Sequence, residues 1–302
     1  MVVLLAGGTG GAKLARGLLD EADELTVIAN TGDDVEIYNS YVSPDPDLIT
    51  FHLADRIDER GWGLAGDTFH VMDGLRELGE DVWFNLGDRD LAICLRRAQR
   101  LEEGARLTQA IDEARQALDV RPRVLPMCDE PVRTHVKARG AWHPFQEFMI
   151  KQRAAGPVED VAFEGIEAAR PTPEVLEALE RADLIVIGPS NPVISIGPIL
   201  AVPGLREAMK APVIAVSPLV RGQVLKGPTD QFLAWAGHPL SSNGIAAHYE
   251  GLLDGLVADE RADSVPTRVT DVEMNDYQAR RRLAREVLLA ERPEELADVP
   301  DQ

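Results

Sequence analysis

The first thirty residues contain an apolar segment, a run of glycines and a second apolar segment, and this order strongly constrains the fold. Residues 2–5 are Val-Val-Leu-Leu and predict a short buried strand, residues 7–11 predict a tight glycine turn, and a helical pattern follows. Residues 25–29 predict a second strand. Two strands separated by a helical segment of about ten residues are typical of a βαβ unit with a right-handed crossover, and hence of a parallel sheet.

The same alternation returns late in the chain. Helical patterns cover residues 173–181 and 204–209, and each is followed by a predicted strand, at residues 184–187 and 213–216. The sequence therefore predicts an α/β fold with a mostly parallel sheet, in a single domain over residues 1–302.

The middle of the chain has a different pattern, which predicts an inserted, largely helical subdomain over residues from about 50 to 160. Three helices are expected there, the last with Thr108 as its N-cap, and two strands follow that form a hairpin or lie side by side. The expected helices cover residues 66–78, 90–101 and 108–118, and the expected strands cover residues 123–127 and 132–137. At the other end, residues 272–302 predict a charged helix as far as residue 290 and a polar tail.

Composition restricts the environment and the partners. Lys and Arg number 31 against 51 Asp and Glu, which gives a net charge of −20, and only five of the cations are Lys. Such an acidic chain is not expected to bind nucleic acids, which need basic groups to neutralise phosphates. The composition favours a salt-rich cytoplasm, where screening weakens the repulsion between surface carboxylates. An acidic protein of a non-halophile is the alternative.

Other features indicate a cytoplasmic globular protein that does not bind membranes. No apolar run approaches the ~18 residues of a membrane span. The first residues have no basic leader, which a signal peptide would need. Cys94 and Cys128 have no metal-binding or redox spacing and are expected to be buried thiols in a reducing compartment.

The glycine turn is a candidate phosphate site. A strand that turns through glycines into a helix leaves backbone N–H groups free at the positive end of the helix dipole. Gly7, Gly8, Thr9 and Gly10 supply those groups, and Lys13 follows within reach of an anion. The segment lacks the Gly-Lys-Ser/Thr of a Walker A motif and the glycine spacing of a dinucleotide site. A turn needed only for packing is the alternative.

Two acidic segments are candidate cation sites. Asp33 and Asp34 follow the second predicted strand, and they bind a divalent cation or only cap a turn. Asp45 and Asp47 alternate with two prolines, which predict a stiff extended segment with both carboxylates on one face. That arrangement favours a hard metal or a general base, and an exposed acidic turn is the alternative.

Two more segments carry hydrogen-bond donors. Arg89 stands between two aspartates at the start of a predicted helix, where it serves a phosphate or a polar heterocycle, or forms a surface ion pair. Ser190 and Asn191 lie in a loop rich in Gly and Pro after a predicted strand, where they suit a base or a phosphate, unless the loop is only an elaborate turn. Because most of these segments follow strands, we expect them to converge on one edge of the sheet.

In their order along the chain, these segments resemble the CofD family, which acts in coenzyme F420 biosynthesis. The resemblance runs from Met1 to about Gly251. The matching segments are Gly7-Gly8-Thr9-Gly10, Asn30-Thr31-Gly32-Asp33-Asp34, Ser43-Pro44-Asp45-Pro46-Asp47, Leu86-Gly87-Asp88-Arg89-Asp90, Phe145-Gln146-Glu147-Phe148, Gly188-Pro189-Ser190-Asn191-Pro192 and Lys226-Gly227-Pro228.

The resemblance implies a Rossmann-like fold, a homodimer and a Mg²⁺-dependent transfer between two small molecules. The 2-phospholactate moiety of lactyl-2-diphospho-5′-guanosine passes to the deazaflavin 7,8-didemethyl-8-hydroxy-5-deazariboflavin (Fo), and the products are F420-0 and GMP. By the same resemblance, Asp47 and Arg89 contact Fo and are the candidate catalytic residues. The glycine loop, Lys13 and the loop of Ser190 and Asn191 match the guanosine diphosphate side. Asp33, Asp34 and Asp45 are the candidate Mg²⁺ ligands.

Two other functions stay open. A non-catalytic CofD-like regulatory protein that binds a nucleotide sugar shares the first glycine turn, although the segments at 43–47 and 86–90 favour the transferase. An NAD-dependent oxidoreductase is disfavoured because Asn30 stands where an acidic residue would hold the ribose. Within the transferase hypothesis, the donor carries lactate, phosphoenolpyruvate or another three-carbon acid. A salt-adapted chain fits a halophilic archaeal source.

Overall fold

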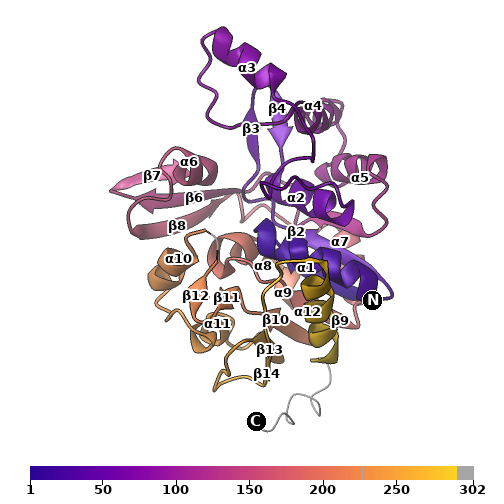
Figure 1. Cartoon of the computed structure of the whole chain (residues 1–302), viewed down its shortest axis with the longest axis vertical. Helices are drawn as coiled ribbons and strands as arrows, with labels where there is room; N and C mark the ends of the chain where they lie inside the picture. Colours follow the sequence, from indigo (N-terminus) through magenta and orange to yellow (C-terminus); the bar gives the residue numbers. More distant parts are fainter. Residues whose placement is uncertain (226, 291–302) are drawn as a thin grey trace.

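Short apolar segments form the central sheet. The computed structural model describes residues 1–225 and 227–290, and within these ranges seven parallel strands lie in the order β14-β13-β10-β9-β1-β2-β5 (Figure 1). Most of their side chains are buried on both faces, as is usual for parallel strands that helices cover. The strands are β1 (Val2–Ala6), β2 (Leu25–Ala29), β5 (Arg123–Pro126), β9 (Leu184–Ile187), β10 (Val213–Val216), β13 (Gly255–Ala258) and β14 (Thr267–Val269).

Helices cover both faces of this sheet. On one face, α1, α2, α5 and α12 bury apolar side chains against Leu4 and Val27. On the other face, α7, α8, α9 and α11 pack against Leu5 and Ile185. Alternate residues of β1 therefore enter two separate cores, which fixes the register of the strand. The helices are α1 (Gly8–Glu21), α2 (Pro44–Leu53), α5 (Leu107–Ala117), α7 (Pro173–Glu180), α8 (Gly197–Ala201), α9 (Leu205–Ala208), α11 (Ser242–His248) and α12 (Tyr277–Leu289).

The strand order reverses at β1. Its neighbours are β2 on one side and β9 on the other, so the chain leaves β1 in one direction and returns much later on the opposite side. In open parallel sheets, such a point creates a crevice beyond the carboxyl ends of the two strands. Glycine-rich loops follow both strands here, after Ala6 and after Ile187. The prediction of an α/β fold with a mostly parallel sheet is confirmed.

Two smaller groups of elements lie beyond the carboxyl edge of the sheet (Figure 1). A hairpin of β3 and β4 with α3 and α4 has its own apolar cluster around Met72 and Leu91. An antiparallel sheet of order β7-β6-β8, with α6 and α10, has another around Phe148 and Phe232. The elements of these groups are β3 (Val35–Ile37), β4 (Ser40–Val42), α3 (His70–Glu77), α4 (Asp88–Glu102), β6 (Arg133–Ala138), β7 (Ala141–Pro144), α6 (Phe145–Ile150), β8 (Val158–Glu164), η1 (Pro192–Ile196) and α10 (Thr229–Trp235). A separate antiparallel pair is formed by β11 (Leu219–Val220) and β12 (Gln223–Val224).

The expected hairpin or side-by-side pair over residues 123–137 is wrong. β5 pairs with β2 in the central sheet, whereas β6 pairs with β7 and β8. The physical reason lies in burial: Val124 and Leu125 are covered on both faces, while β6 alternates buried and half-buried side chains. Residues 50–160 thus hold α3 to α6 together with strands of two sheets. The subdomain boundaries and the single domain over residues 1–302 stay predictions.

Several expected element bounds are also wrong. α1 begins at Gly8, with Gly7 as its extended N-cap, so the glycines lie in the first helical turn. The third helix of the middle segment begins at Leu107 after Arg106, and Thr108 is not its N-cap. The Thr108 hydroxyl instead donates to Asp129 at 2.7 Å. The first of those helices, α3, begins at His70 rather than at residue 66.

The segment expected to be extended at residues 43–47 is the beginning of α2. Pro44 fits the first helical position, and the dipole of a helix favours acidic residues such as Asp45 and Asp47 near its N-terminus. Side chains two residues apart on a helix are rotated by roughly 200° around its axis. The two carboxylates therefore point in different directions rather than to one face.

The C-terminal helix is confirmed as α12, and residues 291–302 of the expected tail lie outside the described residues. Within the described ranges, no helix combines the length and the apolar character that crossing a bilayer requires. Cys94 and Cys128 are buried free thiols, as expected.

Candidate functional site

The N-terminus of α1 is bound to a buried carboxylate. The Gly8 amide donates to Asp45 Oδ1 at 2.7 Å, and the side-chain amide of Asn30 donates to Asp45 Oδ2 at 2.9 Å. The first amides of a helix have no intrahelical partner, so they bind anionic groups well. Asp45 therefore occupies the position at which the sequence predicts a phosphate. Thr9 and Lys13 are partly buried in the first two turns of the same helix.

The loops after β1 and β9 lie against each other at the reversal point of the sheet. A Cβ atom on Gly10 would lie 1.9 Å from the carbonyl oxygen of Pro189, so only glycine fits there. The Ser190 hydroxyl donates to the Gly7 carbonyl, and Asn191 Oδ1 accepts the amides of the first turn of η1. The structure thus brings Gly7, Gly8 and Ser190 together, as expected. Asn191 and Ser190 hold the second loop in place, and their contact with a nucleotide stays a prediction.

Three buried carboxylates lie near this junction, and Asp33 interacts electrostatically with both of the others. Asp33, Asp34 and Asp45 are each at most 6% exposed. Burial, followed by repulsion from Asp45, raises the pKa of Asp33 well above its usual value. Burial raises the pKa of Asp34 to about 7 and that of Asp45 to about 6. These carboxyl groups are therefore protonated more readily than free aspartates, and a bound cation would favour their ionised form.

Two oxygens of this cluster fit a divalent cation. Asp33 Oδ1 and Asp34 Oδ2 are buried and, by distance and angle, accept no hydrogen bond among the described residues. Buried polar atoms without partners are rare, because desolvation costs about 1–3 kcal/mol for each. An oxygen-only set of ligands is the kind that Mg²⁺ prefers. The residues present therefore suit the expected metal.

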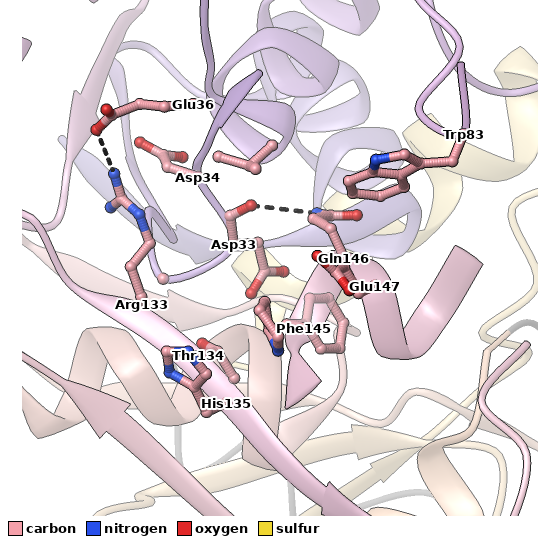
Figure 2. Close-up of a pocket in the computed structure, with 13 residues that line it drawn as sticks. Asp33, Asp34, Glu36, Trp83, Arg133, Thr134, His135, Phe145, Gln146 and Glu147 are labelled. Carbon is pink, nitrogen blue, oxygen red and sulfur yellow. Dashed lines mark hydrogen bonds and ion pairs between the residues drawn. The ribbon is translucent and has the colours of Figure 1, made fainter. Parts of the chain in front are cut away.

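A cavity of about 250 Å³ opens beside these carboxylates (Figure 2). Asp33 and Asp34 lie between Arg133 on one side and Gln146 and Trp83 on the other. The Gln146 side chain donates to the Asp33 carbonyl at 3.2 Å, and Arg133 forms an ion pair with Glu36 at 3.5 Å. The aromatic rings of Trp83 and Phe145 also line the cavity. Its walls thus combine flat apolar surface with acidic and basic groups.

Asp47 lies outside this cavity and is held by an arginine of α4. Both carboxylate oxygens accept from the guanidinium of Arg97, one of them at 3.0 Å. The Arg97 side chain is only 1% exposed. Burial lowers the pKa of Arg97, but Asp47, Cys94 and Asp34 together raise it by more, so the guanidinium stays charged.

Asp47 also belongs to a possible metal-ligating group with Asp90 and Cys94, since one ligand atom of each lies within 4.8 Å of the others. Burial, and then the charge of Asp47, raise the pKa of Asp90 to about 7, and burial raises that of the Cys94 thiol. The charged guanidinium of Arg97 already binds Asp47, and a protonated thiol is a poor ligand. Mg²⁺ therefore fits this group poorly, whereas Asp33, Asp34 and Asp45 offer oxygen donors but do not have three ligand atoms within 4.8 Å of one another.

Arg89 lies at the N-terminus of α4 with a half-exposed side chain. It donates to the Ala65 carbonyl at 2.6 Å, and its Nε lies 3.6 Å from Asp67. The neighbouring Asp88 accepts from Thr68 and from the first amides of α3. Neither Arg89 nor the glycine loop lines the cavity of Figure 2. The expected contact between Arg89 and a substrate stays a prediction.

Sequence reasoning missed several residues of the site. Arg97, Arg133 and Trp83 belong to none of the motifs found in the sequence, and Gln146 was named only as part of a segment that matches the CofD family. A signal for Arg97 exists, because it continues the three-residue spacing of Leu91 and Cys94 on the buried face of α4. A basic residue at such a position needs a buried acidic partner.

Comparisons with known proteins give one consistent result. Residues 2–291 match the family described as "2-phospho-L-lactate transferase CofD". The chain is 41% identical over 309 aligned positions to "Phosphoenolpyruvate transferase" of Streptomyces coelicolor, which covers 95% of this chain and 97% of the relative. It is 39% identical over 265 positions to "2-phospho-L-lactate transferase" of Methanosarcina mazei, covering 86% and 87%.

A further relative and a solved structure extend this result. The "2-phospho-L-lactate transferase" of Methanocaldococcus jannaschii is 35% identical over 302 positions, covering 95% of this chain and 97% of the relative. A crystal structure of a UPF0052 family protein from Bacillus halodurans superposes with a TM-score of 0.57 at 22% identity, covering 87% of this chain and 81% of the other. At that identity the likeness concerns the fold alone.

Proposed function

Because the chain belongs to the CofD family, we propose that it transfers 2-phospholactate in coenzyme F420 biosynthesis, from lactyl-2-diphospho-5′-guanosine to the deazaflavin Fo. The products are F420-0 and GMP. The observation that supports this most is the position of Asp45, which links the amide at the N-terminus of α1 to a cluster of buried carboxylates. A phosphate site and a cation site next to each other are what the transfer of a diphosphate-linked group requires.

The nucleotide would bind at the reversal point of the sheet. The amides of Thr9 and Gly10 and the side chain of Lys13 supply the positive groups for the diphosphate, since the Gly8 amide is bound to Asp45, and the Ser190–Asn191 loop forms the adjoining wall. The net charge of −20 repels such a ligand at long range, so these local donors are essential.

Mg²⁺ would be held by Asp33, Asp34 and Asp45. When bound, it would neutralise charge on the diphosphate and on the leaving GMP. A cation at this place also offsets the repulsion between Asp33 and Asp45, which raises the pKa of Asp33. Mg²⁺ dependence is therefore part of the proposal.

The reaction is an in-line substitution at phosphorus. The terminal ribityl hydroxyl of Fo attacks the phosphorus atom that bears lactate, a P–O bond forms, the P–O bond to GMP breaks, and the hydroxyl proton is released. Positioning provides most of the rate in such transfers. We assign the positioning of Fo to Asp47 and Arg89, which lie on α2 and α4.

The comparisons support two different three-carbon acids in the donor. Relatives named for phosphoenolpyruvate and for 2-phospho-L-lactate transfer are similarly identical to this chain. The decisive experiment incubates the protein with Fo, Mg²⁺ and either guanylylated acid and detects the product by mass. We expect F420-0 from the lactyl donor, and no product when EDTA is present.

Other outcomes separate the alternatives. A product from the phosphoenolpyruvyl donor alone would change the substrate but keep the reaction. Failure of every guanylylated three-carbon acid, together with binding of a nucleotide sugar, would favour the regulatory alternative. The homodimer, the cytoplasmic location and the salt-rich source stay predictions.

A further inference from the structure

Arg97 is among the largest side chains that are fully buried in the described part of the chain. Its two terminal nitrogens donate to the two oxygens of Asp47, and one of them also donates to the Tyr41 carbonyl at 3.0 Å. This fork leaves the Asp47 side chain a single orientation, because both oxygens are fixed at once.

The position of this pair connects the elements of the acceptor site. Asp47 lies in the first turn of α2, two residues after Asp45, which accepts from the glycine loop. Arg97 lies eight residues after Arg89 on α4, which is about 12 Å along the helix. One rigid helix therefore carries both Arg89 and the group that orients Asp47.

Asp47 keeps free acceptor capacity in this arrangement. A carboxylate offers about four lone-pair sites, and the fork uses one on each oxygen. The side chain of Asp47 is 9% exposed, so part of it reaches the surface. The lone pairs that the fork does not use can accept an N–H or O–H group of a ligand that reaches them.

Stability alone does not account for the pair. Burying two charges costs several kcal/mol for each, and a well-packed apolar pair at such a place is often equally stable or more so. The effect that an apolar pair cannot supply is the fixed direction of a carboxylate.

We propose that Arg97 is a positioning residue for the acceptor: it does not touch Fo, but it holds the Asp47 carboxylate in the orientation that binds Fo. The inference rests on the proposed function, because that function assigns Asp47 to Fo. A lysine at position 97 keeps the charge but has a single point donor, so it cannot hold both oxygens.

The test compares Arg97→Lys with the wild type. Deazaflavin fluorescence titration gives the Kd of Fo, and steady-state kinetics give the KM of each substrate. We expect the Kd and the KM of Fo to rise about tenfold, the value of a lost charged hydrogen bond, and the KM of the guanylylated donor to stay unchanged. If Arg97 had only a structural role, Arg97→Lys would reduce the fraction of active protein and therefore kcat. It would not raise the KM of Fo while leaving the KM of the donor unchanged.

Arg100→Lys is the matched control. Arg100 lies one turn further on α4 and pairs at the surface with Glu103 and Glu113. The same exchange there leaves both KM values unchanged. Equal KM values for Fo in Arg97→Lys and in the wild type would overturn the inference.

A second set of variants tests whether Arg97 acts through Asp47. We expect Asp47→Asn and the double variant Asp47→Asn/Arg97→Lys to have the same Kd for Fo, because the orientation no longer matters. If Arg97→Lys does not fold, Asp47→Asn/Arg97→Met, which removes both charges, replaces the double variant. A further tenfold rise in the Kd of Fo in either double variant, compared with Asp47→Asn, would mean that Arg97 contacts Fo itself. That result would overturn the inference. Failure of the wild type to bind Fo would instead overturn the proposed function.

Discussion

Gly8 and Asp45 are joined by a hydrogen bond of 2.7 Å that places a buried carboxylate at the N-terminus of α1. The carboxylate satisfies an amide that has no partner within the helix, and it competes for that amide with any anion that binds there. It also repels Asp33. Asp45 therefore connects the glycine loop to the other candidate metal ligands.

Replacement of Asp45 by asparagine tests this connection. The amide keeps an acceptor for Gly8 but loses the charge that holds a cation. We expect the Mg²⁺ concentration that half-saturates turnover to rise about 10- to 100-fold. Asp23→Asn, at an exposed position in the loop before β2, is the control and leaves the Mg²⁺ dependence unchanged. An unaltered Mg²⁺ dependence in Asp45→Asn would exclude it as a ligand.

The buried carboxylates predict a pH-dependent effect of Mg²⁺ on stability. Asp34 and Asp45 have pKa values of about 7 and about 6 in the folded chain, above the unfolded value. The folded state therefore binds more protons, and these groups make stability fall as the pH rises from about 4 to about 7. Mg²⁺ binds the ionised groups, so it should raise the Tm more at pH 8 than at pH 5.

Thermal unfolding with and without Mg²⁺ at the two pH values measures this effect. Each Tm shift is the Tm with Mg²⁺ minus the Tm without it at the same pH. Taking this difference removes the effect of pH on carboxylates elsewhere in the chain that do not bind Mg²⁺. The Asp33→Asn variant should show a smaller shift at pH 8. Equal Tm shifts at both pH values in the wild type would contradict a cation site made of these groups.

The contact between the two glycine-rich loops predicts a sharp difference between two glycines. Gly10→Ala would place a methyl group against the Pro189 carbonyl, and we expect a loss of about 1–3 kcal/mol in the free energy of unfolding, with weaker nucleotide binding. Gly74→Ala in α3 meets nothing within 4 Å, and alanine suits a helix better. The free energy of unfolding of Gly74→Ala should therefore rise by about 0.4–1 kcal/mol. Denaturant titration of both variants measures the two changes in the free energy of unfolding.

Arg89 offers a test that separates binding from stability. Its ion pair with Asp67 is partly exposed, so Arg89→Ala should cost less than about 1 kcal/mol of stability. If Arg89 contacts Fo, the Kd of Fo rises about tenfold. Arg96→Ala, on the exposed side of the same helix, should change neither quantity. An unchanged Kd in Arg89→Ala would remove it from the acceptor site.

The central sheet was predictable because its strands are short apolar runs between helical patterns. Residues 2–6 and 184–187 are buried on both faces, so their composition alone identifies them. β6 was harder, since half of its side chains are only partly buried and its partners follow it in the chain. No local pattern shows which sheet such a strand joins.

The site was predictable as a set of loops but not as a set of contacts. The convergence of the Gly7 and Ser190 loops follows from strand order, and it is confirmed. The bond from Gly8 to Asp45 and the pair of Asp47 with Arg97 depend on the tilt of α2 and α4, which packing sets. The proline-rich segment was misjudged because proline suits both an extended chain and a first helical turn.

The hydrogen bond from Ser190 to Gly7 spans 183 positions of the chain. The two loops that meet at the reversal point of the sheet therefore come from opposite halves of the polypeptide, and a chain still emerging from the ribosome has only one of them until β9 and the loop after it have been synthesised. An isolated N-terminal half retains the glycine loop without the surface that faces it. The proposed affinity for a guanine nucleotide would then be acquired late in folding, and it could serve as a probe for completion of the whole sheet.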